Sequence, residues 1–236
     1  MTSEVAWRLD AQFANLRCGP LAASVDLFTP SQGLTGLRLH EQPLAGWQLL
    51  GVEIESLDAQ TGATLVDHYQ RGGDLVATYE QTPTRPFRVQ VYWRAALLLL
   101  DGNELPAIDL LVSTQTNLLD SRPALTAASL APKCETVEVA SATQWDNVLL
   151  GRLFRPAGLD VSYTELVHPA DFRGAELTSL PDGSQRLVTR LFRGALEKGV
   201  ILRARVRGVF LPRNDDEAMS AAALADFTRQ PPPLTT

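Results

Sequence analysis

The sequence contains few residues of the kinds that bind metals or form cross-links. Among its 236 residues are only two cysteines and three histidines. Cys18 and Cys134 have neither CxxC spacing nor a nearby histidine, as a zinc site would need. A site built from His40, His68 and His168 would need all three to converge from separate regions. We therefore expect no metal and two reduced, structural thiols, although a disulfide between the cysteines is also compatible with the sequence.

The sequence also lacks the short motifs of several large enzyme classes. It has no GxSxG elbow, no P-loop, no GxGxxG segment and no HExxH segment. These motifs supply the nucleophile of α/β-hydrolases, the phosphate cradles of nucleotide-binding proteins and the zinc ligands of zincins. We therefore expect none of these chemistries and no cofactor.

Positive charge and long apolar runs are scarce as well. The net charge is -6 and the pI is about 5.1, which argues against attraction to nucleic acid or anionic membranes by bulk charge. The longest apolar run lies in residues 94–102 and is far too short to cross a bilayer. The first residues, "MTSEVAWRLDAQF", contain an acid and no apolar core of a signal peptide. We therefore expect a cytoplasmic protein that binds neither nucleic acid nor membranes.

Short stretches of alternating apolar and polar residues make up most of the chain. This period of two, broken by Gly, Pro, Asp and Asn, predicts strands. The predicted strands are residues 5–9, 21–28, 34–40, 47–57, 63–70, 74–80, 87–93, 107–115, 124–130, 135–140, 148–154, 160–168, 174–179, 185–196 and 200–211. So many strands favour an all-β fold, a large two-sheet antiparallel sandwich that forms one domain over residues 1–236.

The end of the chain differs from the rest. Within residues 214–236, Asp215 or Asp216 can cap a helix that contains "EAMSAAALADF". The prolines of "QPPPLTT" then end this helix and predict an extended tail. Just upstream, "LEKGV" predicts a tight turn closed by Gly199, so we expect the last three strands to form a meander.

Residues 200–209, "VILRARVRGV", place three arginines on one face of a strand. Arg203, Arg205 and Arg207 share one parity, and the opposite parity is apolar and predicts core. The arginines could bind an anionic ligand, since guanidinium groups fit carboxylates and phosphates. The interpretation that we favour is a set of ion pairs, with Glu53 and Glu55 of "GVEIESL" as the expected partners.

A second candidate region combines aromatic and basic residues. In "RVQVYWRA", Tyr92 and Arg94 share a strand face, and Arg71 and Tyr69 lie in the preceding polar and aromatic segment. Flat rings suit the CH faces of sugars, and forked charged groups suit their hydroxyls. The same residues are also common on ordinary sandwich surfaces, so both interpretations stay open.

The segment "YTELVHPADF" holds the third candidate. Strand parity places Glu165 and His168 on opposite faces, and Asp171 could orient the imidazole of His168. A histidine at a strand end next to a turn is suitably placed for a general acid, although a lone histidine is more often a surface or packing residue.

The run of strands, "ELVHPADF", and "LEKGVILRARVRGVFLPR" followed by a terminal helix resemble the galactose mutarotase-like supersandwich of aldose 1-epimerases. The resemblance implies a histidine acid and a glutamate base that open a sugar ring without metal or cofactor. His168 would be the acid, and either Glu165 or Glu197 would be the base.

Two hypotheses about function follow. In the first, the protein binds or acts on a sugar or uronic acid in a shallow cleft that includes Arg71, Tyr92, Arg94, Arg203 and Arg205; if it is an enzyme, it is an epimerase-like isomerase. In the second, it is a non-catalytic assembly protein whose sheet faces bind another protein or a second copy of the chain. A phosphate or sulfate site at the arginines is a third, weaker alternative.

Overall fold

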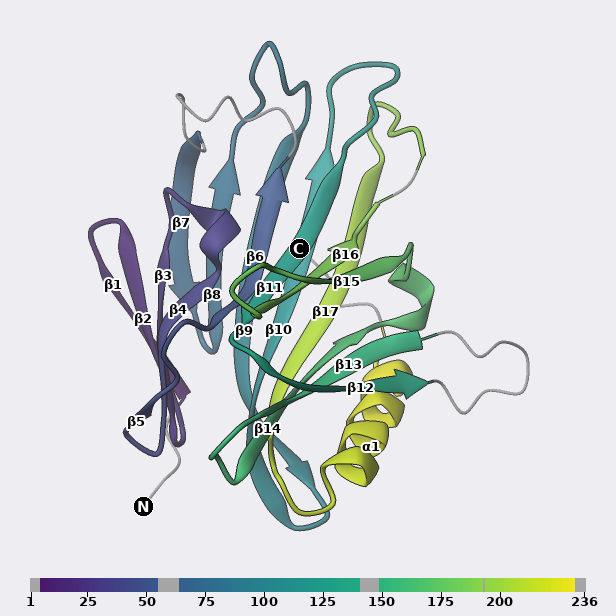
Figure 1. Cartoon of the computed structure of the whole chain (residues 1–236). Coiled ribbons are helices and arrows are strands. Elements are labelled where there is room, and N and C mark those ends of the chain that lie inside the picture. The colour runs from purple at the N-terminus through teal and green to yellow at the C-terminus, as the bar shows by residue number, and fades with distance from the viewer. Residues whose placement is uncertain (1–4, 55–63, 141–148, 193, 232–236) are drawn as a thin grey trace.

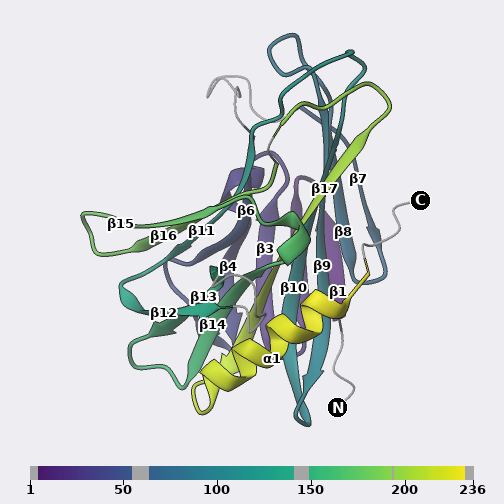
Figure 2. The same cartoon turned by 90° about the vertical axis from the view of Figure 1, so that its right-hand side faces the viewer.

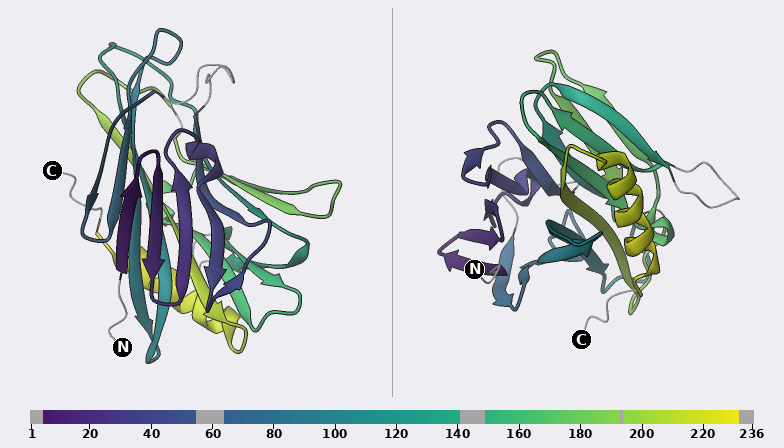
Figure 3. Two further views of the ribbon diagram at one scale, coloured as in Figure 1. Left: turned by 90° about the vertical axis from the view of Figure 1, so that its left-hand side faces the viewer. Right: turned by 90° about the horizontal axis from the view of Figure 1, so that it is seen from below.

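Two large antiparallel sheets form a sandwich. The computed structural model describes residues 5–54, 64–140, 149–192 and 194–231, and places 17 strands in them. The first sheet has the order β1-β2-β3-β4-β6-β11-β16-β15, with β5 paired to β4, and the second has the order β12-β13-β14-β17-β10-β9-β8-β7. Figure 1 shows the long strands of the second sheet, and Figure 3 shows the two layers from below. The predicted all-β, two-sheet sandwich is confirmed.

The strands of the first sheet are β1 (Val5–Asp10), β2 (Phe13–Cys18), β3 (Leu21–Asp26), β4 (Leu34–Leu39), β5 (Gln42–Pro43), β6 (Gln48–Ile54), β11 (Leu125–Ala131), β15 (Ala175–Ser179) and β16 (Gln185–Arg190). Those of the second sheet are β7 (Leu65–Arg71), β8 (Asp74–Tyr79), β9 (Arg88–Leu100), β10 (Asn103–Gln115), β12 (Cys134–Ala140), β13 (Leu149–Pro156), β14 (Val161–Val167) and β17 (Ile201–Pro212). One α-helix, α1 (Asp216–Arg229), and two short 3-10 helices, η1 (Pro30–Gln32) and η2 (Pro169–Asp171), complete the described elements.

The main core lies between the two sheets. Trp93 of β9 and Tyr79 of β8 are fully buried there, and each makes a hydrogen bond to the first layer: Trp93 Nε1 donates to the Leu50 carbonyl at 3.0 Å, and the Tyr79 hydroxyl donates to the Leu27 carbonyl at 2.9 Å. These bonds fix the two layers relative to one another while the aromatic rings fill the space between them. A smaller core forms where α1 packs on the other face of the second sheet.

One predicted connection is wrong. The turn at Gly199 exists, with φ of 83° and a hydrogen bond from the Val200 amide to the Glu197 carbonyl. However, β16 ends at Arg190, and the chain crosses to the second sheet, where β17 pairs with β14 and β10. The expected meander is therefore only the hairpin of β15 and β16. Strand parity across the turn also predicts that Arg193 joins Arg203, Arg205 and Arg207 on one face, the arginine face, but Arg193 lies outside the described residues.

The helix α1 covers part of the arginine face of β17. Figure 2 shows α1 lying across the second sheet, and Val209, Leu211 and the helix residue Phe227 pack together there. The Arg207 guanidinium binds Asp109 of β10 at 2.6 and 2.9 Å and Asp226 of α1 at 2.9 Å. It also lies 4.4 Å from the centre of the Phe227 ring. Arg207 therefore links the helix to the sheet.

The ion pairs of the arginine face do not involve the predicted partners. Glu53 lies on β6 in the first sheet, where its carboxylate binds Arg186 and accepts a hydrogen bond from Thr126. Glu55 lies outside the described residues. The interpretation of the arginines as ion-pair partners is confirmed for Arg205 and Arg207, but their carboxylates come from Asp171, Asp109 and Asp226.

A carboxyl group lies inside the sandwich. Glu165 of β14 is 1% exposed and faces the first sheet. Its Oε2 atom accepts hydrogen bonds from the Ser129 hydroxyl at 2.5 Å and the Tyr163 hydroxyl at 3.1 Å. Burial raises the pKa of Glu165 from 4.5 to about 7, because the interior disfavours the charged form more than the two hydroxyls favour it.

Replacing Arg207 should destabilise the fold much more than replacing its neighbour Arg203. Arg207→Gln removes the cation that joins Asp109 to Asp226, and the ion pair that Asp226 keeps among the described residues is its 3.9 Å contact with the exposed Arg229. Breaking such a buried pair costs about 3 kcal/mol. Arg203→Gln changes an exposed side chain on the same strand and should cost less than about 0.5 kcal/mol. Urea denaturation measures both, with the midpoint falling strongly for Arg207→Gln only. Equal midpoints for the two variants would show that Arg207 does not hold the helix on the sheet.

Glu165 should make the fold less stable as the pH rises from 4.5 to 7. Because the pKa of the folded state is raised, the folded protein holds a proton that the unfolded chain has lost in this range, so unfolding becomes easier with increasing pH. At about 1.4 kcal/mol per pH unit, the total loss is about 3 kcal/mol. Glu165→Gln should remove this part of the pH dependence in urea denaturation, whereas Glu197→Gln, at an exposed position, should not. Identical pH profiles for wild type and Glu165→Gln would contradict the assignment.

Candidate functional site

The outer face of the second sheet carries a row of alternating charges. Strand register places five residues next to one another, one on each of β7, β8, β9, β10 and β17: Arg71, Asp74, Arg94, Asp109 and Arg207. We name the outward-facing surface of these five strands the charged face. Residues directly opposite in an antiparallel sheet lie close enough to interact, so each arginine in the row has an aspartate beside it.

Most guanidinium groups of the charged face are already bound by carboxylates. Arg94 binds both oxygens of Asp74, at 2.7 and 3.0 Å, in the same two-pronged manner in which Arg207 binds Asp109. Arg205 Nε donates to Asp171 at 2.7 Å. Such paired arginines have few donors left for a ligand.

Three arginines of the charged face lack a close carboxylate partner and stay partly accessible, namely Arg71, Arg88 and Arg203. The Arg71 side chain is 52% exposed and its Nη2 lies 3.7 Å from the Asp74 carboxylate, a loose contact. Arg203 is exposed and makes no ion pair with any carboxylate in the part of the chain that the structure describes. Arg88 of β9 is also partly accessible, since its side chain is 41% exposed and its Nε lies 3.8 Å from the Glu80 carboxylate. Arg71 and Arg203 are the accessible cations of this face that lie near Tyr92.

Aromatic residues lie between these two arginines. In the neighbouring row, Tyr69, Val76, Tyr92 and Leu111 are adjacent by register. Tyr92 is 4% exposed, and its hydroxyl donates to Gln90 at 2.6 Å. Burial and the neighbouring Tyr69 raise the pKa of Tyr92, and both Arg71 and Arg203 lower it, because each places positive charge near the phenol. Tyr92 thus lies buried beneath the surface between the two arginines, and the half-buried Tyr69 has the ring that is more accessible to solvent.

His168 lies at the edge of the same face, beneath α1. Its ring packs edge-on against Phe227 at 5.4 Å, and its Nδ1 atom accepts a hydrogen bond from the Ala170 amide at 3.3 Å. Burial and the nearby Arg205 lower the pKa of His168. The predicted orientation by Asp171 is wrong, because that carboxylate binds Arg205. His168 is 8% exposed, so the helix separates it from solvent.

The expected acid and base pair does not assemble. Glu165 points into the sandwich, whereas His168 lies on the outer side of the second sheet, as strand parity predicts. Glu197 is exposed in the turn before β17 and makes no side-chain hydrogen bond with any described residue. The structure therefore brings together the predicted binding residues Arg71, Tyr92, Arg94, Arg203 and Arg205 on one face, but not the predicted catalytic residues.

Two carboxylates that bind Arg207 of the charged face, those of Asp109 and Asp226, were not predicted from the sequence. Asp109 is the one charged residue in the otherwise apolar and buried stretch "AIDLLV", so this lone charge was an available signal. Asp226 carried no such signal, since only the docking of α1 brings it to Arg207.

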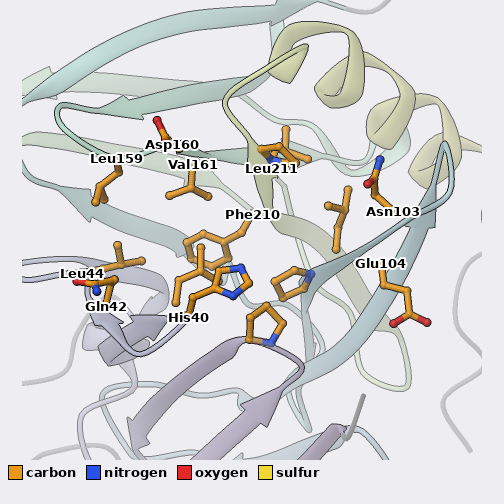
Figure 4. Close-up of a pocket in the computed structure, with 15 residues that line it drawn as sticks. His40, Gln42, Leu44, Asn103, Glu104, Leu159, Asp160, Val161, Phe210 and Leu211 are labelled. Atoms are coloured by element: carbon orange, nitrogen blue, oxygen red, sulfur yellow. The ribbon is translucent and has the colours of Figure 1, made fainter. Parts of the chain in front are cut away.

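A separate cavity of about 540 Å³ opens at one end of the sandwich. Figure 4 shows Phe210 and His40 in the middle of the view, with Asn103, Glu104 and Asp160 towards its edge. Its remaining lining is mostly apolar, and it includes none of the predicted site residues. Among the described residues, no cluster of three or more His, Cys, Asp or Glu side chains is arranged to hold a metal ion, and no helix is long and apolar enough to cross a membrane.

Comparison with known proteins identifies the fold. No protein-family model matches the sequence, and no curated protein matches it. A protein from Klebsiella pneumoniae described as a putative aldose 1-epimerase has a similar structure, with a TM-score of 0.61 and 8% identity over 95% of this chain and 88% of that chain. The Slr1438 protein from Synechocystis sp. PCC 6803 is similar with a TM-score of 0.56 and 9% identity over 90% of this chain and 97% of that chain.

A third similar structure is a mutant of the heparan sulfate lyase HepC from Pedobacter heparinus. Its TM-score is 0.50 and its identity is 9%, over 90% of this chain but only 37% of the lyase chain. At such low identities these likenesses concern the fold alone. The chain shares the two-sheet sandwich fold of the putative aldose 1-epimerase and of Slr1438, and the sequence resemblance implied a fold of this kind.

Proposed function

We propose that the protein recognises carbohydrate on the charged face and that its ligand carries an acidic group, as a uronic acid does. Recognition of carbohydrate is supported by the fold, which the chain shares with a protein described as a putative aldose 1-epimerase and with a mutant heparan sulfate lyase. Fold alone does not determine function, so the proposal depends on the residues of the face.

The observation that carries the proposal is the placement of Arg71 and Arg203 around Tyr92. These two arginines are exposed, whereas the guanidinium groups of Arg94, Arg205 and Arg207 are bound by carboxylates. A guanidinium group can bind the carboxylate of a uronic acid through two parallel hydrogen bonds. The aromatic and apolar row beside it suits the CH face of a sugar ring.

The arrangement favours binding over epimerase chemistry. Opening a sugar ring needs an acid and a base on either side of one cleft. Here the second sheet separates Glu165 from His168, Glu197 lies in an exposed turn, and Asp171 is bound to Arg205. The proposed function is therefore carbohydrate binding rather than isomerisation.

Removing Arg71 or Arg203 should weaken the binding of D-galacturonate. We expect wild type to bind this probe in isothermal titration calorimetry, and Arg71→Gln and Arg203→Gln each to weaken binding about tenfold or more, because each loses a charge-assisted hydrogen bond of about 1.5–3 kcal/mol. Arg190→Gln, an exposed arginine of β16 in the other sheet, is the matched control and should bind like wild type.

Two results would contradict this proposal. One is the absence of any heat of binding with D-galacturonate at millimolar concentration. The other is binding that persists unchanged in both Arg71→Gln and Arg203→Gln.

A second candidate function is assembly through one end of the sandwich. The loop after β10 and the start of β17 expose Leu118, Leu119, Val200 and Ile201, and Leu119 is 85% exposed. Paired backbone hydrogen bonds between Ser121 and Leu196 hold the two loops together, and Figure 1 shows them side by side at the top. Exposed apolar side chains gathered in this way are typical of a contact surface.

If this end mediates self-association, the protein should form a dimer, and a single charged residue introduced at this end should disrupt the dimer. Leu119→Asp should shift the mass in size-exclusion chromatography with light scattering from dimer to monomer, since burying a carboxylate in an apolar contact is unfavourable. Leu99→Asp, at an exposed leucine near the opposite end of β9, is the control and should leave the mass unchanged. A wild-type monomer at high concentration would rule out this assembly.

A further inference from the structure

A second cavity, unrelated to the charged face, lies between the two sheets near one edge. Its volume is about 370 Å³, within the range of small-molecule sites. Figures 1 and 2 show where the hairpin of β15 and β16 in the first sheet lies near β13 and β14 of the second. The lining residues are Leu149, Leu150, Gly151, Arg152, Glu165, Val167, Phe172, Gly174, Ala175, Leu187 and Thr189.

Two buried polar atoms in this cavity have no partner among the described residues. They are the Oε1 atom of Glu165 and the Oγ1 atom of Thr189, which come from opposite sheets. Glu165 is 1% exposed and Thr189 is 0% exposed. Buried polar atoms are nearly always hydrogen-bonded, and leaving one unsatisfied is costly. Two such atoms lining one cavity indicate that a polar molecule completes the site.

Neighbouring side chains fix the direction of the Glu165 carboxyl group. The Leu50 amide donates to the Ser129 hydroxyl at 2.9 Å, so the hydroxyl proton of Ser129 is directed at Glu165 Oε2 at 2.5 Å. The Tyr163 hydroxyl donates to the same oxygen at 3.1 Å. Oε2 is therefore held by the protein, and Oε1 is left for a molecule in the cavity.

The lining defines the chemistry of that molecule. A hydroxyl group both donates and accepts, so it can pair with Glu165 Oε1 in either protonation state and with the Thr189 hydroxyl. The walls formed by Leu150, Leu187 and Phe172 are apolar and suit a CH surface. Arg152 is the only cation in the lining, and Glu138 at 2.9 Å compensates its charge, so the lining favours a neutral molecule.

We propose that this cavity binds a small, neutral, polyhydroxylated molecule no larger than a single six-membered ring, held by Glu165 and Thr189. This site lies on the inner side of the second sheet, and His168 and the charged face lie on the outer side. The proposal therefore does not depend on the function proposed for the charged face.

The test uses myo-inositol as the probe, because it is a neutral ring of hydroxyl-bearing carbons. Titration of wild type with myo-inositol, followed by methyl NMR, should shift the signals of Val167 and Leu187, which line the cavity. Thr189→Val should weaken binding at least tenfold without lowering the melting temperature, because the hydroxyl that it removes has no partner in the protein. Thr178→Val, at an exposed threonine of β15, is the matched control and should bind like wild type.

Three results would overturn the proposal. The first is unchanged myo-inositol binding in Thr189→Val. The second is the absence of any methyl shift at saturating myo-inositol, which would mean that the cavity holds only water. The third is shifts confined to Val76 and Leu111, which would place the molecule on the charged face instead. Failure of D-galacturonate binding would leave this test unaffected, so the two proposals can fail separately.

Discussion

The interaction on which the outer side of the second sheet depends is the link between Arg207, Asp109 and Asp226. A single guanidinium group joins β10 and β17 to α1, and the Phe227 ring packs against it. Because the helix is held there, it covers His168 and the adjoining end of the arginine face. Without this link, Arg207 would be a further unpaired cation and the helix would lose its ion pair to the sheet.

The second sheet acts as a partition between two different environments. Alternate residues of β14 point to opposite sides, so Glu165 faces the interior and His168 follows on the outside. The interior side provides a desolvated carboxyl group and an apolar cavity, whereas the outer side provides arginines, aspartates and tyrosines. One strand thus contributes to two surfaces of different chemistry, and His168 and Glu165, one of the two expected bases, lie on opposite sides of the sheet.

Much of the fold could be predicted from the sequence, because strand formation depends on local alternation. All fifteen predicted strands correspond to strands in the structure. β2 was missed because it contains no β-branched residue, although Ala14, Leu16 and Cys18 alternate as buried positions. β9 was predicted too short because the hairpin signal Asp101-Gly102, where both residues have positive φ, was not recognised.

The candidate site was harder to predict, because it depends on contacts between distant segments. The shared face of Arg203, Arg205 and Arg207 followed from parity alone, but their partners did not: Asp109, Asp171 and Asp226 lie far apart in the chain. Local patterns also could not predict that the chain crosses from the first sheet to the second between β16 and β17. Because of this crossing, Glu53 lies in the other sheet and pairs with Arg186 instead of the arginines of β17. The lack of a hydrogen-bond partner for the Thr189 hydroxyl within the described part of the chain could not be predicted either, because it depends on the positions of all its neighbours.

We propose that Arg71, Arg203 and the aromatic row of the charged face form one carbohydrate site. A crystal structure of the protein soaked with D-galacturonate tests this proposal. We expect a sugar ring over the Tyr69 and Tyr92 row, with its carboxylate bound by Arg71 or Arg203. A sugar bound elsewhere, with the guanidinium groups of both arginines facing only solvent, would contradict it.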